Sequence, residues 1–523
     1  MLLNRPRLIR GGVRTEARKQ PTADCPLEPV RPRGRLYLSL GQHIGRPALP
    51  VVTPGEPVAR GQRIGRADGA LSAHVHAPTS GRVAAITRHV APHPSGLPVL
   101  TVVIEADGAG RWADDLPEPF TGAAGQLPPQ VIAERVADAG IVGLGGAAFP
   151  AAVKLDPEQP VTTLILNGGE CEPYLTCDDR LMRERAAGLI DGAGLIAHAL
   201  GAARIAVGIE DNKREAIHAV RHAAEKLDPR VEVTPVPSLW PQGSEKHLIY
   251  ALTGREVPAG ARAGDIGVVV HNVGTAYAVH RAIRHGHPLI SRPVTVGGGA
   301  VAEPGNFEVP LGLPFQELLE HAGGLTEAPE RVLAGGPMMG PVVSLEAAVA
   351  KGTNGVIALT ADEVREAREH PCIRCGQCVD ACPMGLMPFE IANRAARDDL
   401  DGAAANGLMD CLTCGSCAYV CPAGRPLVQL MHYARGQRAE QAAAAERADL
   451  QRRLAEQRAE RQRREAERKR AKAAARKRQR QTPASDGGKA PAQGQEASSD
   501  QQPSKDSADA PKTSATTNEE PPS

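Results

Sequence analysis

The chain has 523 residues, with 61 Lys and Arg against 60 Asp and Glu, so its formal net charge is only +1. The length leaves room for about three or four domains. No apolar run approaches the roughly 18 residues of a transmembrane helix, so we expect that the chain does not cross a membrane by itself. The charges are unevenly distributed along the chain. Residues 435–480 contain 17 basic and 7 acidic residues, whereas residues 481–523 contain 3 basic and 7 acidic residues. The basic charge therefore belongs to a tail and not to the body.

The N-terminal part divides into an arm and a small β module. Residues 1–35 are rich in Arg and Pro and predict a flexible, poorly ordered arm. Residues 36–110 hold short strand signals separated by Gly and Pro, and they resemble a biotinyl/lipoyl-type barrel-sandwich. Carrier domains of that type bear a Lys where this chain has Ala70, so we expect a structural module without a prosthetic arm. Four histidines lie in or near this module, namely His74, His76, His89 and His93. We expect them to be scattered surface residues and not the ligands of a metal ion.

Residues 127–285 alternate β-branched strand segments with helical ones, which predicts an α/β domain with a largely parallel sheet. Four polar, glycine-containing loops interrupt it: GLGGAAFPAAVKL (143–155), NGGECEPYLTCDDRLM (167–182), LWPQGSEKHLIYALTG (239–254) and VVVHNVGTAYAV (268–279). Small residues let a backbone approach a ligand, and open α/β sheets bind ligands at the ends of their strands. For the second loop, a plain helix cap at Thr176 and Asp178 is an equal alternative.

As an ordered set, these loops resemble those of the flavin- and NADH-binding subunit of respiratory complex I. That pattern runs R-G-G-A-G-F-P-T-G-x-K, N-x-D-E-x-E-P-G, C-G-E-E-T-A-L and N-N-V-E-T. The resemblance implies FMN against the Gly-rich loop, its phosphate near the later Asn and Thr, and NADH stacked over the flavin. The residues that it assigns to these ligands are Gly145, Gly146, Ala147, Phe149, Lys154, Asn167, Glu170, Glu172, Gly243, Glu245, Asn272 and Thr275. Ala148 and Tyr174 replace glycines of the pattern and Gly169 replaces an Asp, so the NADH side matches less well.

Residues 286–345 follow the predicted flavin domain. Their strand signals and a helix that ends at Gly323 and Gly324 resemble the β-grasp (SLBB-like) module found after the flavin domain in the same protein of complex I. The connection GGPMMG (335–340) predicts a packing loop, with a role in lining the cofactor path as the alternative.

Residues 360–434 contain two matched cysteine runs, CIRCGQCVDACP (372–383) and CLTCGSCAYVCP (411–422). Both follow C-x2-C-x2-C-x3-C-P, the spacing of two-cluster bacterial ferredoxins, in which the fourth Cys of each run ligates the other [4Fe-4S] cluster. The predicted sets are Cys372, Cys375, Cys378 and Cys421 for cluster 1, and Cys382, Cys411, Cys414 and Cys417 for cluster 2. Paired zinc sites usually have a different spacing, so they fit these runs poorly. A disulfide framework is also not expected, because eight of the 11 cysteines lie in these runs and the N-terminus has no recognisable secretory signal. Two further thiols, Cys171 and Cys177, lie in the second flavin loop, and the sequence leaves open whether they are redox-active, bind a metal or are simply buried.

The C-terminal tail has two parts. Residues 435–480 are Ala, Glu, Arg and Gln almost throughout and predict a charged, solvated helix held by i,i+4 pairs. A solubilising extension and contact with anionic lipid or acidic partner loops are equal alternatives for its role, and nucleic-acid binding is not expected. Residues 481–523 are rich in Pro, Ser and Gln and predict disorder.

Together, these patterns predict a multidomain α/β chain. Its predicted parts are a lipoyl-like barrel-sandwich, a Rossmann-like flavin domain, a β-grasp module, a two-cluster ferredoxin-like α domain and a charged, then disordered tail. Over residues 35–435 it is similar to the C subunit of Rnf/Rsx ion-translocating oxidoreductases. This resemblance implies a translocase-type oxidoreductase component, peripheral on the cytoplasmic side of the bacterial inner membrane. It would pass electrons between NAD(H), FMN, the two clusters and the membrane and peripheral partner subunits that move the ion, with ferredoxin as an indirect partner.

Two other functions stay open at the sequence level. One is a soluble diaphorase subunit of a hydrogenase or dehydrogenase, and the other is an electron-wiring scaffold that has lost its flavin. No catalytic acid or base is assigned, and neither the direction of electron flow nor the ion follows from the residues.

Overall fold

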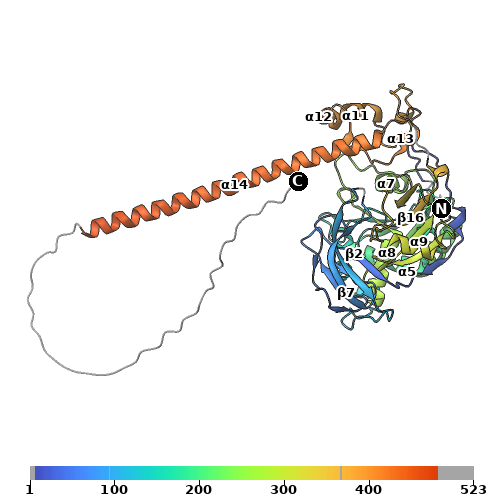
Figure 1. The fold of residues 1–523 in the computed structure, drawn as a ribbon, viewed down its shortest axis with the longest axis horizontal. Helices are drawn as coiled ribbons and strands as arrows, with labels where there is room; N and C mark the ends of the chain where they lie inside the picture. Colours follow the sequence, from blue (N-terminus) through green and yellow to red (C-terminus); the bar gives the residue numbers. More distant parts are fainter. Residues whose placement is uncertain (1–5, 94, 365–367, 481–523) are drawn as a thin grey trace, which may run out of the picture. The chain divides into compact units, whose positions relative to one another are not determined.

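The computed structural model describes residues 6–93, 95–364 and 368–480 (Figure 1). The predicted disordered tail, 481–523, lies outside the described residues. The chain forms two units, Met1–Ala442 and Ala443–Ser523. Within the described ranges, no helix combines the length and the apolar character that crossing a bilayer requires.

The N-terminal β module consists of two small sheets. One has the strand order β2-β8-β7-β4 and the other β3-β5-β6. Their bounds are β2 (Arg35–Ser39), β3 (Leu49–Pro50), β4 (Pro57–Val58), β5 (Arg63–Arg66), β6 (Val75–His76), β7 (Gly81–Val90) and β8 (Pro98–Ala106). Contrary to the sequence prediction, His76 is buried, because both residues of β6 face packed structure. Burial keeps the pKa of His76 well below its usual value, so the ring is neutral.

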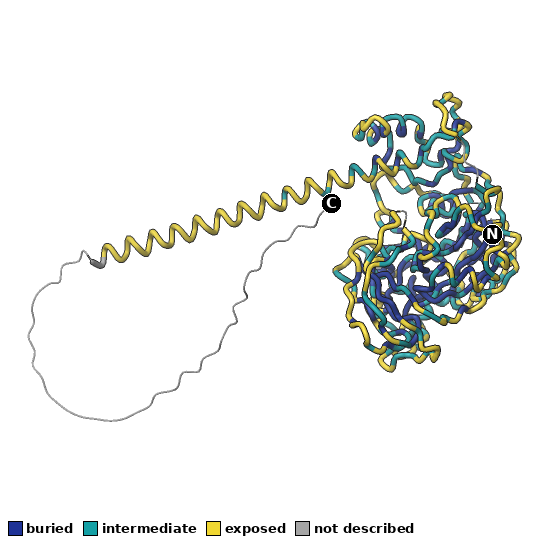
Figure 2. Tube along the Cα trace, viewed as in Figure 1, coloured by how far each residue is buried: buried dark blue, intermediate teal, exposed yellow. Residues whose placement is uncertain are grey.

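The second module contains a four-stranded sheet in the order β11-β10-β9-β12, with every pair parallel. Its strands are β9 (Thr163–Gly168), β10 (Arg204–Glu210), β11 (Val231–Val236) and β12 (Val268–Asn272). Its helices are α2 (Pro129–Asp138), α3 (Ala151–Lys154), α4 (Cys177–Glu184), α5 (Ala186–Leu200), α6 (Arg214–Leu227), α7 (Glu245–Thr253) and α8 (Val273–His285). The amphipathic spacing of α6 buries Ala216, Ile217 and Val220 while its polar positions stay exposed, which is why this segment folds as a covering helix. In Figure 2 the buried residues (dark blue) lie in the interior of the unit Met1–Ala442, and the exposed residues (yellow) lie toward its outside.

The third module is a five-stranded sheet in the order β1-β14-β13-β16-β15. Its elements are β1 (Leu27–Pro29), β13 (Ser291–Gly297), β14 (Gly305–Pro310), α9 (Phe315–His321), β15 (Arg331–Ala334) and β16 (Gly355–Leu359). The sheet therefore continues beyond residue 345, the predicted end of the β-grasp module, because β16 pairs with both β13 and β15.

The structure corrects the prediction of a flexible arm over residues 1–35 for the part that it describes. Residues 20–23 form α1 (Gln20–Ala23), and β1 pairs in parallel with β14 at the edge of the third sheet. Thr22 is buried, and its carbonyl accepts a hydrogen bond from Asn306 Nδ2. Arg and Pro content takes no account of pairing with a distant sheet. Here β14 offers an unpaired strand edge, and pairing of β1 with that edge orders the arm.

The fourth module is helical and holds both cysteine runs. Its helices are α10 (Gln377–Asp380), α11 (Pro388–Ala395), α12 (Leu400–Ala405), α13 (Ser416–Tyr419) and the start of α14 (Leu427–Arg480). The last of these begins eight residues before the predicted charged helix, because Leu427, Met431 and Ala434 are buried against this module. From residue 443 onward most of α14 is exposed and forms i,i+4 pairs such as Glu460 with Arg464.

Candidate functional site

Two neighbouring parallel strands end side by side at the candidate site. Asn167 on β9 and Asn272 on β12 are register partners, so both side chains lie at the carboxyl edge of the sheet. Asn272 also caps α8, where its Oδ1 accepts a hydrogen bond from the Gly274 amide at 2.8 Å. Its Nδ2 donates to Asp178 Oδ2 at 2.7 Å. The amino end of a 13-residue helix therefore opens at the strand edge.

The Gly-rich loop lies against this helix end. The buried Thr275 hydroxyl accepts a hydrogen bond from the Leu144 amide at 3.0 Å, which ties the loop to the first turn of α8. A Cβ added to Gly145 would lie 3.4 Å from Asn272, whereas one added to Gly146 would meet open space. Together with Ala147, these glycines are exposed, so a bare backbone surface faces outward beside the helix end. Such a surface fits the phosphate of a nucleotide or flavin.

Lys154 and Glu245 join the same edge from α3 and α7. Lys154 Nζ lies 3.1 Å from Glu245 Oε2 and donates to the Val270 carbonyl at 3.0 Å. The predicted residues Gly145, Lys154, Glu245, Asn272 and Thr275 are therefore brought together around the ends of β12 and α8.

The two replaced glycines keep a glycine-like backbone. Ala148 has φ of 48° and Tyr174 has φ of 68°, both in the left-handed region that side chains disfavour. The Tyr174 hydroxyl donates to Glu363 Oε1 at 2.8 Å and its amide donates to the Ala17 carbonyl at 2.9 Å, so tertiary contacts hold this conformation. The loop shape that glycine serves in the related pattern is thus retained here at a cost in strain.

At the third departure, Gly169, crowding disfavours a side chain. Asn167 Nδ2 donates to the Gly243 carbonyl at 2.7 Å, and its Oδ1 accepts from the Gly169 amide at 2.9 Å. A Cβ on Gly169 would lie 3.0 Å from both the Asn167 side chain and the Gly243 Cα. The second and third loops therefore meet closely at this glycine, and an Asp here would have to displace a neighbour.

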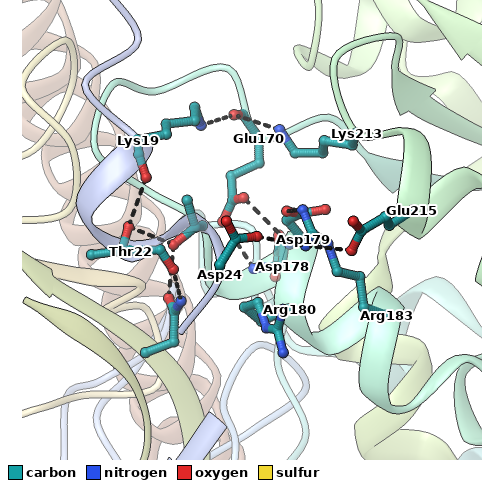
Figure 3. A network of polar contacts seen from close by, with 12 residues as sticks. Lys19, Thr22, Asp24, Glu170, Asp178, Asp179, Arg180, Arg183, Lys213 and Glu215 are labelled. Atoms are coloured by element: carbon teal, nitrogen blue, oxygen red, sulfur yellow. Dashed lines mark hydrogen bonds and ion pairs between the residues drawn. The ribbon is translucent and has the colours of Figure 1, made fainter. Parts of the chain in front are cut away.

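Glu170 serves as an internal cap in this structure (Figure 3). Its carboxylate accepts hydrogen bonds from the amides of Asp178 and Asp179 at the start of α4, at 2.8 and 3.3 Å. Burial raises the pKa of this carboxyl to about 7. The helix-cap interpretation of the loop is therefore correct in kind, but Glu170 supplies the cap in place of Thr176.

Two lysines that were not predicted from the sequence hold the backbone of this loop. The backbone carbonyl of Glu170 lies between Lys19 Nζ and Lys213 Nζ, at 2.6 and 3.5 Å, as Figure 3 shows. Lys213 also forms a buried ion pair of 2.7 Å with Glu210. Lys19 belongs to the supposed arm, so no local signal could have placed it here. The Lys213–Glu210 spacing of three residues was visible, but its burial was not.

The remaining polar residues of the second loop face away from solvent. Glu172 accepts hydrogen bonds from the amides of Met338 and Met339, both at 2.9 Å, and burial raises its pKa to about 7. Burial raises the pKa of Cys171 to about 12 and that of Cys177 well above its usual value. Cys177 is buried and Cys171 is half-buried. Protonated thiols are poor nucleophiles and metal ligands, which favours a packing role for both.

A second missed pair, Arg292 and Lys351, connects the Gly-rich loop to other modules. The fully buried Arg292 donates to the carbonyl of Leu144 at 3.1 Å and to that of Lys351. Lys351 Nζ donates to the carbonyls of His74 and Gly140, and burial lowers its pKa to about 7. Neither residue belongs to a recognisable motif, so only the fold shows that they brace the loop.

The structure places cysteines of the two runs close together in two groups. A cavity in the helical module is lined by Cys382, Cys411, Cys414 and Cys417, among apolar neighbours that include Leu386, Val428 and Met431. The electrostatic neighbours of Cys378 are Cys421, Cys372 and Cys375. Each group thus draws one Cys from the other run. Among the described residues no cluster of His, Cys, Asp or Glu is tight enough for a single metal ion, whereas a [4Fe-4S] cube needs thiolates spread around a cavity.

Four family models match the chain. The RnfC barrel sandwich hybrid domain matches residues 8–109, and the Nuo51 FMN-binding domain matches residues 136–281. The SLBB domain matches residues 293–342, and the 4Fe-4S dicluster domain matches residues 371–425. The chain therefore combines flavin-binding and iron-sulfur domains in one polypeptide.

Curated relatives match the chain over most of its length. The C subunit of the ion-translocating oxidoreductase complex of Rhodobacter capsulatus is 52% identical over 437 residues, 83% of this chain and 83% of the relative. The corresponding protein of the proton-translocating ferredoxin:NAD(+) oxidoreductase complex of Clostridium ljungdahlii is 42% identical and covers 84% and 95%. That of the Na(+)-translocating ferredoxin:NAD(+) oxidoreductase complex of Acetobacterium woodii is 42% identical and covers 82% and 96%. The chain belongs to the family formed by the C subunits of the ion-translocating oxidoreductase complexes.

Proposed function

We propose that this protein passes electrons between NAD(H) and the membrane-bound partners of its complex, through FMN and two [4Fe-4S] clusters. The observation that supports this most directly is a continuous packed contact between the loop after β9 and the Cys382–Cys417 cavity. Glu172 in that loop accepts from the Met338 amide, and the Met338 carbonyl lies beside Gly415, next to Cys414. A flavin site and a cluster site so joined fit stepwise electron transfer.

Bound FMN would supply hydride acceptance and one-electron release, the two kinds of chemistry that join NADH to an iron-sulfur cluster. The chain's part is to bind and orient it. Gly145, Gly146 and Ala147 offer bare backbone for close approach, with Phe149 at the end of the loop. Asn272 and Thr275 present the amino end of α8 to the phosphate.

The other assigned residues shape the pocket walls. Lys154 and Glu245 form a charged pair beside the strand edge, and Asn167 holds the carbonyl of Gly243. Glu170 and Glu172 set the loop that would cover the NADH side, acting through backbone amides. The role that we propose for these residues is to position the flavin and the nucleotide.

The cluster ligands follow from the interleaved runs. Cys372, Cys375, Cys378 and Cys421 would hold cluster 1, and Cys382, Cys411, Cys414 and Cys417 would hold cluster 2. Bound there, the clusters would supply one-electron transfer, and the hydrogen bonding and burial of these cysteines would set the cluster potentials.

The proposal extends to place and partners. We assign the protein to the cytoplasmic face of a bacterial inner membrane, attached through integral-membrane and peripheral subunits that move the ion. The named relatives move different ions, protons in one case and Na+ in another, so the ion is left unassigned. The arrangement fits a soluble diaphorase subunit less well, because the chain combines the RnfC barrel sandwich module with a double-cluster ending.

The decisive test is NADH titration of the anaerobically purified and reconstituted protein, following flavin bleaching and cluster absorbance together. We expect both signals to respond, with about eight irons and one FMN per chain. A protein that holds its iron but takes up no FMN after reconstitution would instead be the electron-wiring scaffold, and the proposed function would be wrong.

A further inference from the structure

A small buried cluster joins the second module to the helical cysteine module. We call it the docking joint and define it as Val13, Trp240, Ala381 and Cys414, whose exposed fractions are 6%, 5%, 7% and 9%. Cys171, Met338, Leu412 and Val420 pack against it. The joint therefore brings together the N-terminal segment, two flavin-domain loops, GGPMMG and both cysteine runs.

Hydrogen bonds fix the geometry of the joint. Trp240 Nε1 donates to the backbone carbonyl of Cys414 at 2.7 Å, and this bond is buried. Val13 exchanges two backbone hydrogen bonds with Trp240, at 2.8 and 3.0 Å. The Gly12 amide donates to the Ala381 carbonyl at 3.0 Å, so the N-terminal segment clasps Trp240 on one side and the cysteine module on the other.

Close approach at Gly11 shows how tight this clasp is. Gly11 has φ of 59°, and a Cβ there would lie 2.7 Å from the carbonyl oxygen of Cys382. On α7, His247 Nε2 makes a further contact of 3.2 Å with the Pro383 carbonyl. Three of these partners, Cys382, Pro383 and Cys414, belong to or adjoin the predicted ligands of cluster 2.

The ligands of cluster 1 lie differently. Cys375 is exposed, and its neighbour Ile373 has 67% of its surface exposed. Three of the four predicted ligands of cluster 2 are buried, whereas only one of the four predicted ligands of cluster 1 is. The exposed ligand gives another protein close access to cluster 1. The two clusters are therefore not equivalent in their surroundings.

We infer that Trp240, clasped by the Gly11–Val13 segment, is a positioning residue that holds cluster 2 against the flavin domain, so that electrons pass between flavin and cluster 2 and reach the partner protein through cluster 1. This inference rests on the proposed function and adds the order of the path. Oxidation of one NADH to NAD+ and a proton releases two electrons, which cross the joint in two successive one-electron transfers. The opposite direction uses the same order in reverse.

Trp240 should also affect the reduction potential of cluster 2, because it contacts the predicted ligand Cys414. Its indole N–H points at the carbonyl of a ligating residue, and a donor near a cluster favours the more negative, reduced state. Loss of this donor should lower the midpoint potential of cluster 2 and leave that of cluster 1 unchanged.

The chain has two tryptophans, which makes the proximity directly measurable. Trp112 stacks on His287 at 4.2 Å, outside the docking joint, so Trp112→Phe leaves Trp240 as the sole Trp fluorophore and Trp240→Phe is its matched counterpart. We expect Trp240 emission to be strongly quenched when the clusters are reconstituted. Cys417→Ser should restore most of this emission, whereas Cys378→Ser should restore little. Equal recovery in the two Cys variants would overturn the placement of Trp240 beside cluster 2.

Potentials and rates test the order itself. In EPR-monitored titrations, Trp240→Phe should lower the potential of one cluster while Trp112→Phe changes neither, and two unchanged potentials in Trp240→Phe would contradict its role. In rapid mixing with NADH, Cys378→Ser should still reduce its remaining cluster quickly, whereas Cys417→Ser should reduce its remaining cluster many-fold more slowly. If the remaining cluster were reduced at the same rate in both variants while NADH still reduced the flavin, the proposed function would stand. The proposed order of the clusters in the path would then be wrong.

Discussion

Thr275 offers the sharpest test of how the Gly-rich loop is held. Its side chain is fully buried, and its hydroxyl accepts the Leu144 amide at 3.0 Å. Thr275→Val keeps the shape of the side chain but leaves that buried N–H without its partner. An unsatisfied buried donor costs about 1–3 kcal/mol, so the free energy of unfolding should fall by that amount.

The loss should also weaken FMN binding. If binding must restore about 1 kcal/mol of loop order, the dissociation constant rises about fivefold. Urea unfolding of the apoprotein and flavin fluorescence titration measure the two effects separately. Thr163→Val is the matched control, because the Thr163 hydroxyl is also buried but makes only a long 3.4 Å contact with Thr162. A Thr275→Val protein as stable as the wild type, or a control that loses as much, would refute the reasoning.

Three further predictions concern strain, pH and buried charge. Ala148→Gly should stabilise the protein by about 0.5–1 kcal/mol in urea unfolding, because φ of 48° strains alanine, whereas the neighbouring Ala147→Gly should destabilise it; a loss in both would contradict this. Glu172 has a folded pKa of about 7, above its unfolded value of about 4.3, so its contribution is greatest at low pH and is lost as the pH rises through about 7. Glu172→Gln should therefore flatten the fall in unfolding free energy between about pH 5 and pH 8, and an unchanged slope would count against it. Lys213→Met leaves the Glu210 carboxylate, 2% exposed, without its partner and should cost about 3–5 kcal/mol, against less than about 1 kcal/mol for Arg230→Met at a more exposed pair; equal costs would show that burial is not the cause.

Most of the modules could be predicted from the local sequence, because each is recognised by residues that lie close together in the chain. The spacing of the cysteine runs predicts interleaved groups, and the structure brings Cys382 to the second run and Cys421 to the first. The loops after β9 and β12 meet because parallel strands present their ends at one edge. The cysteine relation needs only spacing, whereas the meeting of the two loops also needs β9 and β12 to be neighbours, which the structure shows.

The N-terminal segment shows where such reasoning fails. Its Arg and Pro content indicates disorder, yet Lys19 lies under the carbonyl of Glu170 and Val13 pairs with Trp240. Partners more than 150 residues away satisfy these groups, and composition contains no information about them. The same holds for Arg292 and Lys351, whose burial depends on three modules meeting.

The set of parts can be read from the residues alone, namely the flavin-type loops, the largely parallel sheet that precedes them and the eight cysteines in two predicted sets. How the parts touch becomes visible only in the folded chain, where Glu170 and Glu172 turn inward onto backbone amides and Trp240 contacts Cys414. The two kinds of information differ in range. Motif spacing and strand pairing act over a few residues or one sheet edge, whereas burial and hydrogen bonding between modules depend on surfaces that form only once each module has folded.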